Sequence, residues 1–138
     1  MKNWIIVLLI FILPLTFYAY LDAKAQSYKM CKVEGNEVVK NPKAKIIKFY
    51  SPMCSECQEM TVELNKAMEN YKDTVLVEEI NVIEENSQMK KHSKDAIKEF
   101  KITLVPSIVF LNKDGKVIKK NQGLMKSNEI IEVLDGIK

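Results

Sequence analysis

Two cysteines separated by two residues, Cys54 and Cys57, stand between a strand-like stretch and a helix-like stretch. Residues 46–50 before them are rich in Ile and aromatic side chains, and apolar residues after Cys57 recur with helical spacing. Two thiols three positions apart in the first turn of a helix can form a disulfide with little backbone movement. The free amides and the dipole of a helix N-terminus also stabilise a thiolate. We therefore expect a fold in which a strand leads directly into a helix that carries both thiols.

The same spacing occurs in zinc sites, so the pair alone leaves two interpretations open. A structural zinc site needs about four ligands. The other candidates, Cys31 and His92, do not lie at ligand spacing. We therefore favour a redox pair, and we predict neither a metal site nor a cofactor.

The composition suits one domain and argues against a surface that reads nucleic acid. The chain has 138 residues and a net charge of +3, and all of its 21 basic side chains are lysines. Arginine, whose planar fork is preferred for phosphate and base recognition, does not occur in the sequence. The lysines are best explained as solvated faces of a small domain.

The N-terminus carries an apolar run from Trp4 to Leu21, preceded by Lys2 and followed by Ala23-Lys24-Ala25. These features are typical of a secretory signal peptide cleaved after Ala25. The run of about 18 residues is also near the minimum for a membrane-spanning helix, so an uncleaved anchor through residues 4–21 is the alternative. In both cases residues 1–25 are a signal peptide or an N-terminal hydrophobic anchor helix. Residues 26–138 then form an extracytoplasmic domain, secreted or anchored to the outer face of the membrane.

Export bears on the cysteines, because disulfides persist outside the cytoplasm. The chain has three cysteines, so Cys31 is left over once Cys54 and Cys57 pair. Cys31 is either a buried or idle thiol, or an intermolecular or regulatory partner.

Periodicity and turn signals predict the order strand–strand–helix–strand–helix–strand–strand–helix, which is a mixed sheet with helices on its faces. The first half comprises extended pieces at Met30–Val33 and Glu37–Lys40, a strand at Lys45–Tyr50, a helix with apolar residues Met60, Leu64, Ala67, Met68 and Tyr71, and a strand at Thr74–Val82. The second half comprises a helix capped by Asn86 or Ser87 with the stripe Met89, Ala96, Ile97 and Phe100, a hairpin of Ser107–Leu111 and Lys116–Lys120, and a helix capped by Ser127 with Ile130, Ile131, Leu134 and Ile137.

Three separate segments resemble one family. Phe49-Tyr50-Ser51-Pro52-Met53-Cys54-Ser55-Glu56-Cys57 resembles the F-Y-x-P-W-C-x-x-C signature of thioredoxin-like proteins, and Val105-Pro106-Ser107-Ile108-Val109-Phe110 resembles their V-P-T-hydrophobic segment. Asp114-Gly115-Lys116 followed by Gly123 matches their terminal hairpin. The resemblance covers about Lys43–Lys138 and implies an α/β thioredoxin-like fold, with a central mixed sheet flanked by helices.

The resemblance also implies roles and an activity. Cys54 would be the exposed nucleophile and Cys57 the buried resolving thiol of a thiol–disulfide oxidoreductase. Pro106 would be a cis-proline beside the pair, with the Val105 backbone offering hydrogen bonds to a client chain. The residues alone would favour an ordinary trans proline at a strand start. The partners would be protein thiols and disulfides, together with an unidentified redox partner.

The chain departs from the family pattern at Lys48, where many thioredoxins place a buried carboxylate, and at Glu79, where they place a lysine. We interpret these residues as a charge-swapped pair, in which Glu79 is the base assisting Cys57 and Lys48 favours a thiolate. The alternative is that both side chains reach solvent, and a one-residue slip would put Glu78 in the place of Glu79 and on the opposite face. Met53 replaces the usual Trp with a flexible apolar side chain.

Glu56 lies between the two cysteines in sequence, and its charge disfavours thiolates, so we expect a reductase in preference to an oxidase or isomerase. Two other functions stay open from sequence. The fold could carry a soft metal on the two thiols, or it could serve only as an interaction module with an inert cysteine pair.

Overall fold

Strand β1 (Ala44–Tyr50) forms the centre of the sheet in the computed structural model, which describes residues 41–137. It pairs in parallel with β2 (Val75–Asn81) and antiparallel with β3 (Ser107–Asn112), and β3 pairs antiparallel with β4 (Val117–Gln122). The strand order is therefore β2-β1-β3-β4. The predicted order of elements is confirmed from the strand at Lys45–Tyr50 onward.

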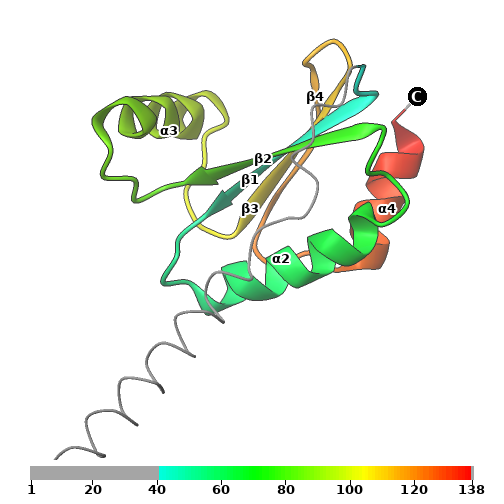
Figure 1. Cartoon of the computed structure of the whole chain (residues 1–138), viewed down its shortest axis with the longest axis horizontal. Coiled ribbons are helices and arrows are strands. Elements are labelled where there is room, and N and C mark those ends of the chain that lie inside the picture. The colour runs from blue at the N-terminus through cyan, green and yellow to red at the C-terminus, as the bar shows by residue number, and fades with distance from the viewer. Residues whose placement is uncertain (1–40, 138) are drawn as a thin grey trace, which may run out of the picture. The chain divides into compact units, whose positions relative to one another are not determined.

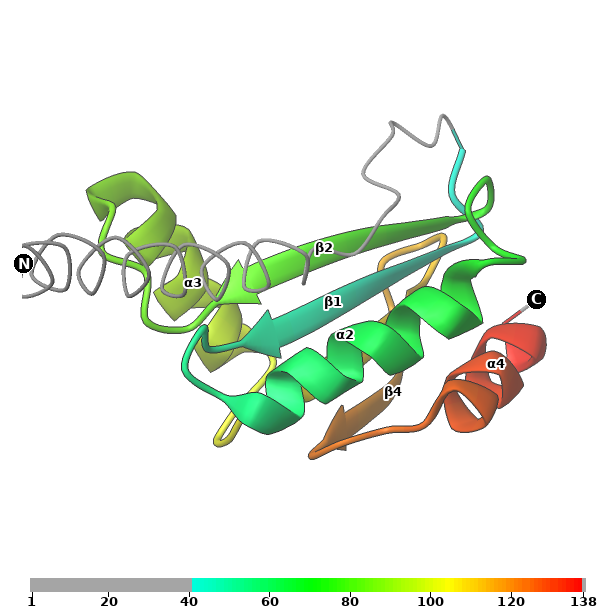
Figure 2. The same cartoon turned by 60° about the horizontal axis from the view of Figure 1, so that its bottom comes forward.

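Three helices cover the two faces of this sheet: α2 (Ser55–Met68), α3 (Ser87–Glu99) and α4 (Ser127–Gly136). Helices α2 and α4 lie on one face and α3 lies on the other, as Figures 1 and 2 show. Each face has its own apolar core. Phe110 and Leu64 belong to the core under α2 and α4, whereas Phe49 and Val109 belong to the core under α3. Strand β1 contributes Ile46 to the first core and Ile47 and Phe49 to the second, so its apolar residues are explained by burial on two sides.

Helix α2 begins directly after Cys54, whose sulfur accepts a hydrogen bond from the Cys57 amide at 3.1 Å. The Cys54 sulfur thus takes the place of the side-chain oxygen that a Ser or Asp commonly provides at an N-cap. The predicted buried stripe is confirmed through Met68, where the helix ends. Tyr71, which we expected on this helix, lies in the following turn and accepts the amides of Thr74 and Val75 with its carbonyl.

Two expectations for the other helices are wrong in detail. Asn86 caps α3 as predicted, accepting from the Gln88 amide, but Met89 is exposed because only the later turns of α3 pack on the sheet. Ser127 does not cap α4. It is the first helical residue, and Glu129 instead accepts the amide of Lys126 at 2.8 Å.

Several expectations lie outside the described residues. These are the signal peptide or anchor of residues 1–25, the extended pieces at Met30–Val33 and Glu37–Lys40, and the role of Cys31. Between residues 41 and 137, none of the helices has the length and apolar character needed to cross a bilayer.

Glu63 on α2 fastens the start of α4 to the helix that carries the cysteines. Its carboxylate accepts the Ser127 amide at 2.9 Å and the Lys66 ammonium at 2.9 Å. The Ser127 amide, helped by Lys66, lowers the pKa of Glu63 from 4.5 to about 2. A carboxyl whose pKa is lower in the folded than in the unfolded chain stabilises the fold above its unfolded pKa, and this contribution is lost as pH falls.

The variant Glu63→Gln is therefore expected to lower the free energy of unfolding at pH 7. The difference from the native chain should shrink between about pH 4.5 and pH 2, the interval over which Glu63 titrates in the two states. Urea denaturation at a series of pH values measures it. Glu132→Gln, at an exposed position of α4, is the matched control. A difference between Glu63→Gln and native that stays constant from pH 7 to pH 2 would contradict the assignment.

Candidate active site

The two cysteines of the C-x-x-C segment form a disulfide at the N-terminus of α2, with 5.2 Å between their Cα atoms. Cys57 is buried on the inner side of α2, whereas Cys54 is partly accessible. The Cys57 amide points at the Cys54 sulfur, so a thiolate on Cys54 would accept a backbone hydrogen bond as well as the favourable end of the helix dipole. The site thus offers one reachable sulfur and one shielded sulfur.

Val105 and Pro106 lie beside the reachable sulfur. The peptide bond between them is cis, as the resemblance implied, and the Val105 carbonyl is 4.0 Å from the Cys54 sulfur. Gly123, which follows β4, donates its amide to the Pro106 carbonyl at 2.7 Å. With φ at 108°, Gly123 takes a backbone conformation that residues with a side chain rarely adopt. The hydrogen bond from Gly123 thus fixes the Val105–Pro106 loop to the segment that follows β4.

Lys48 lies in the middle of β1 with only 1% of its side chain exposed. Its ammonium donates to the Glu79 carboxylate at 2.7 Å and to the Thr61 hydroxyl, and it lies 5.3 Å from the centre of the Tyr50 ring. A buried charge needs such partners, because breaking a buried ion pair typically costs about 3–5 kcal/mol. The alternative in which Lys48 reaches solvent from a sheet edge is therefore wrong.

Strand register settles which glutamate faces Lys48. Lys48 and Glu79 are direct partners across β1 and β2, and Glu78 points to the other face, toward α3. The slipped register is therefore excluded. Glu79 is on the outermost strand of the described sheet and is 14% exposed, so it connects the buried ammonium to water. Glu79 is among the residues that line a pocket of about 310 Å³ between the end of β2 and the start of α3.

Thr61 links this charged pair to the cysteines, and sequence reasoning missed it. Its hydroxyl accepts from Lys48 and donates to the Cys57 carbonyl at 3.0 Å. Thr61 is one helical turn after Cys57, so both residues lie on the buried face of α2. A single hydroxyl within an otherwise apolar stripe was the signal that could have identified it.

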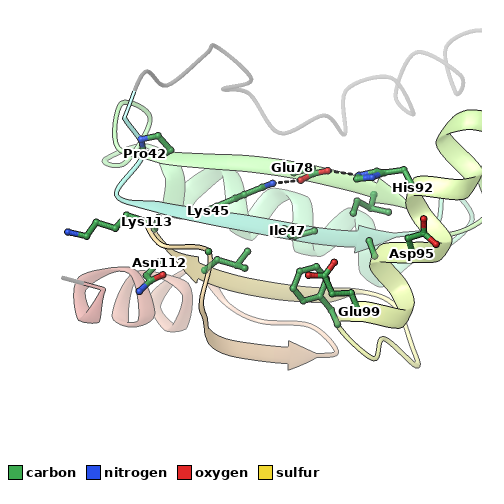
Figure 3. A pocket seen from close by; sticks show the side chains of 15 residues that line it. Pro42, Lys45, Ile47, Glu78, His92, Asp95, Glu99, Asn112 and Lys113 are labelled. Atoms are coloured by element: carbon green, nitrogen blue, oxygen red, sulfur yellow. Dashed lines mark hydrogen bonds and ion pairs between the residues drawn. The ribbon is translucent and has the colours of Figure 1, made fainter.

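A second hollow, of about 380 Å³, lies on the face of the sheet that α3 covers, and the cysteines are not among the residues that line it. Figure 3 shows Lys45, Glu78 and His92 in a row along one side of it, with Asp95 and Glu99 projecting from α3. Glu78 accepts from Lys45 at 2.6 Å and from His92 at 2.8 Å. Burial raises the pKa of Glu78, but these two hydrogen bonds outweigh burial and hold the pKa below its ordinary value. These contacts tie α3 to the sheet.

The family model and the curated relatives that match this chain agree on one family. A model of the thioredoxin-like domain matches residues 32–138. The chloroplastic thioredoxin-like protein HCF164 of Oryza sativa is 29% identical over 79 residues, which are 57% of this chain and 28% of that protein. The chain spans between 21% and 36% of the length of the curated relatives it matches here.

Solved structures agree with the fold. A thioredoxin-like protein from Clostridium perfringens superposes with a TM-score of 0.60 at 29% identity, covering 76% of this chain and 79% of that one. StoA from Bacillus subtilis superposes with a TM-score of 0.53 at 21% identity, covering 76% and 93%. The family model covers more than half of the sequence, and the cysteine pair, the cis-proline and the strand order lie within the matched range. The chain therefore belongs to the thioredoxin-like family.

Proposed function

We propose that this protein is a thiol–disulfide oxidoreductase that exchanges disulfides with client proteins through Cys54 and Cys57. The observation that carries the proposal is the bonded sulfur pair at the start of α2, with one sulfur reachable beside the cis-proline loop and the other buried. The family name of the matched domain supports the same chemistry.

The exchange proceeds in two displacements. In the reduced protein the Cys54 thiolate attacks one sulfur of a client disulfide, forms a mixed disulfide and releases the other client sulfur as a thiolate. The Cys57 thiolate then attacks the Cys54 sulfur, which restores the 54–57 disulfide and releases the client as a dithiol. Two electrons pass from protein to client, and a dithiol partner must return them. The Val105 carbonyl would orient the client backbone during the first step.

Single cysteine variants test this order. In a Cys31→Ser background, Cys54→Ser is expected to abolish reduction of a client disulfide, whereas Cys57→Ser should accumulate the mixed disulfide because nothing resolves it. Nonreducing gels and intact mass spectrometry with a disulfide-bonded peptide measure both results. Accumulation of the adduct on Cys57 in the Cys54→Ser variant would reverse the assigned roles.

Metal that copurifies with the reduced protein and protects both thiols from alkylation would favour the metal-carrying alternative.

We further propose that Glu79 takes the proton from Cys57 and that Lys48 holds Glu79 in position. Lys48 and Thr61 join Glu79 to the Cys57 backbone, and Glu79 alone of these groups has access to water. The buried ammonium also favours a thiolate on Cys57 over the neutral thiol.

Glu79→Gln is expected to slow resolution of the mixed disulfide, because an amide can still accept from Lys48 but cannot take up a proton. Rapid-quench measurement of adduct decay gives the rate, and its dependence on pH shows whether a titrating group has been lost. Glu78→Gln, on the opposite face of the same strand, is the matched control. Equal decay rates in Glu79→Gln and native protein would remove Glu79 from the mechanism.

We also propose that the pair acts as a reductant, because Glu56 is an exposed carboxylate next to Cys57 in sequence and disfavours thiolates on both cysteines. The expected reduction potential lies near about −270 mV, as in reducing members of the fold, and equilibration with a glutathione series measures it. A potential near about −120 mV would identify an oxidant.

The location we propose is outside the cytoplasm, with residues 26–138 as the working domain and residues 1–25 as a cleaved signal or a membrane anchor. The charged start, apolar run and Ala23-Lys24-Ala25 ending support it. Cell fractionation combined with N-terminal mass spectrometry distinguishes the secreted form, the anchored form and a cytoplasmic protein. The last result would refute the proposal.

A further inference from the structure

We propose that the surface around Cys54 selects client segments that are apolar beside their cysteine and carry lysine or arginine on either side. This inference rests on the proposed exchange activity, because it concerns which chains reach the Cys54 sulfur. It is carried by the composition of the loops that the sheet brings to that end of the domain.

Strand pairing gathers four separate segments around the cysteines. The ends of β1 and β2 are paired at Tyr50 and Asn81, and Ser107 at the start of β3 faces both Phe49 and Gln122 near the end of β4. The segments that follow β1, β2 and β4, and the one that precedes β3, therefore meet at one end of the sheet.

Hydrogen bonds and proximity hold these segments together. Val82 donates its amide to the Tyr50 carbonyl at 2.9 Å, which joins the loop after β2 to the loop that carries Met53. The Cys54 sulfur and the Val105 carbonyl are 4.0 Å apart, so the loop before β3 lies beside the loop that carries Met53 and Cys54. A client bonded to Cys54 would consequently contact all three loops.

Each of these three loops exposes one large apolar side chain. Met53 is 87% exposed, and Ile83 and Leu104 are each 50% exposed. Exposed apolar side chains grouped around a reactive atom are typical of a binding surface. Met53 is unbranched and flexible, so it can adapt to apolar side chains of different shapes. We call Met53, Ile83 and Leu104 the apolar patch.

The charges around the apolar patch differ in sign from those of the chain as a whole. The protein has 21 lysines and a net charge of +3, yet residues 51–59, 81–89, 102–107 and 122–125 contain no lysine. The same segments contain four glutamates, Glu56, Glu59, Glu84 and Glu85.

Two of these glutamates are committed to the fold. Glu59 is paired with Lys126, and Glu84 accepts the amides of Glu85 and Asn86. Glu56, in the first turn of α2, and Glu85, in the loop after β2, are both exposed, so they contribute the charge that an approaching client meets. Exposed charges act over roughly 8 Å at physiological ionic strength, which is enough to attract a cation on residues flanking the client cysteine.

Three synthetic peptides test the selection. Each carries one cysteine as a mixed disulfide with glutathione. The first has leucines beside the cysteine and lysines outside them, the second replaces the lysines by glutamates, and the third replaces the leucines of the first by serines. The second-order rate of reduction by the reduced, full-length protein is measured for each peptide from low to high salt, with neutral 2-hydroxyethyl disulfide as a reference.

The lysine peptide is expected to react about tenfold faster than the glutamate peptide at low ionic strength, with the ratio approaching one in high salt. The serine peptide should react more slowly than the lysine peptide at every salt concentration. The double variant Glu56→Lys/Glu85→Lys should abolish or invert the ratio, whereas Asp73→Lys/Glu132→Lys, which changes net charge equally at exposed positions elsewhere, should preserve it. Because the readout is a ratio, a change in sulfur reactivity, which affects both peptides, cancels.

Equal rates for the lysine and glutamate peptides, together with reduction of 2-hydroxyethyl disulfide, would overturn the selection while leaving the exchange activity in place. A ratio lost equally in both double variants would also overturn it, since only net charge would then matter. No reduction of 2-hydroxyethyl disulfide would refute the exchange activity itself and, with it, this inference.

Discussion

The ammonium of Lys48, enclosed in the central strand, is the constraint around which this domain is organised. Burying an unpaired charge at that depth would cost too much free energy for the domain to fold, so the surrounding residues must supply hydrogen-bond acceptors. Glu79 supplies one from the neighbouring strand, and Thr61 supplies another from the helix that begins at the cysteines. One side chain therefore connects two strands and a helix, and the same contacts link a partly exposed carboxylate to the backbone carbonyl of Cys57.

Local sequence signals were sufficient to predict most of the fold. The apolar run of β1, the spacing on α2 and the Asp114-Gly115 turn each reflect interactions among residues close in sequence, and the structure has these elements nearly where we expected them. The predictions were wrong where tertiary packing overrides local pattern. Met89 fits the stripe of α3 but is exposed in the first turn of that helix, and Tyr71 continues the period of α2 after its backbone has left the helix.

The site divides in the same way. The cysteines were evident from their spacing, and the cis bond at Pro106 followed only from family resemblance, since no local property of Val105-Pro106 requires it. That Lys48 faces Glu79 depends on the register of a parallel pair, which a one-residue slip would have changed, so the sequence left two glutamates as candidates. Thr61 and the apolar patch were missed because the role of each depends on contacts with residues that are distant in sequence.

The two links between α2 and α4 have a mechanical consequence. Glu59 holds Lys126 and Glu63 holds Ser127, so the first turn of the C-terminal helix is fastened along the side of the helix whose tip carries the sulfurs. In the proposed exchange, a client bonded to Cys54 would load α2, and these links would pass part of that load into α4 as well as into the short loop after β1. Removing the C-terminal helix would accordingly loosen the anchorage of the cysteine pair, even though both cysteines and every residue between them would still be present.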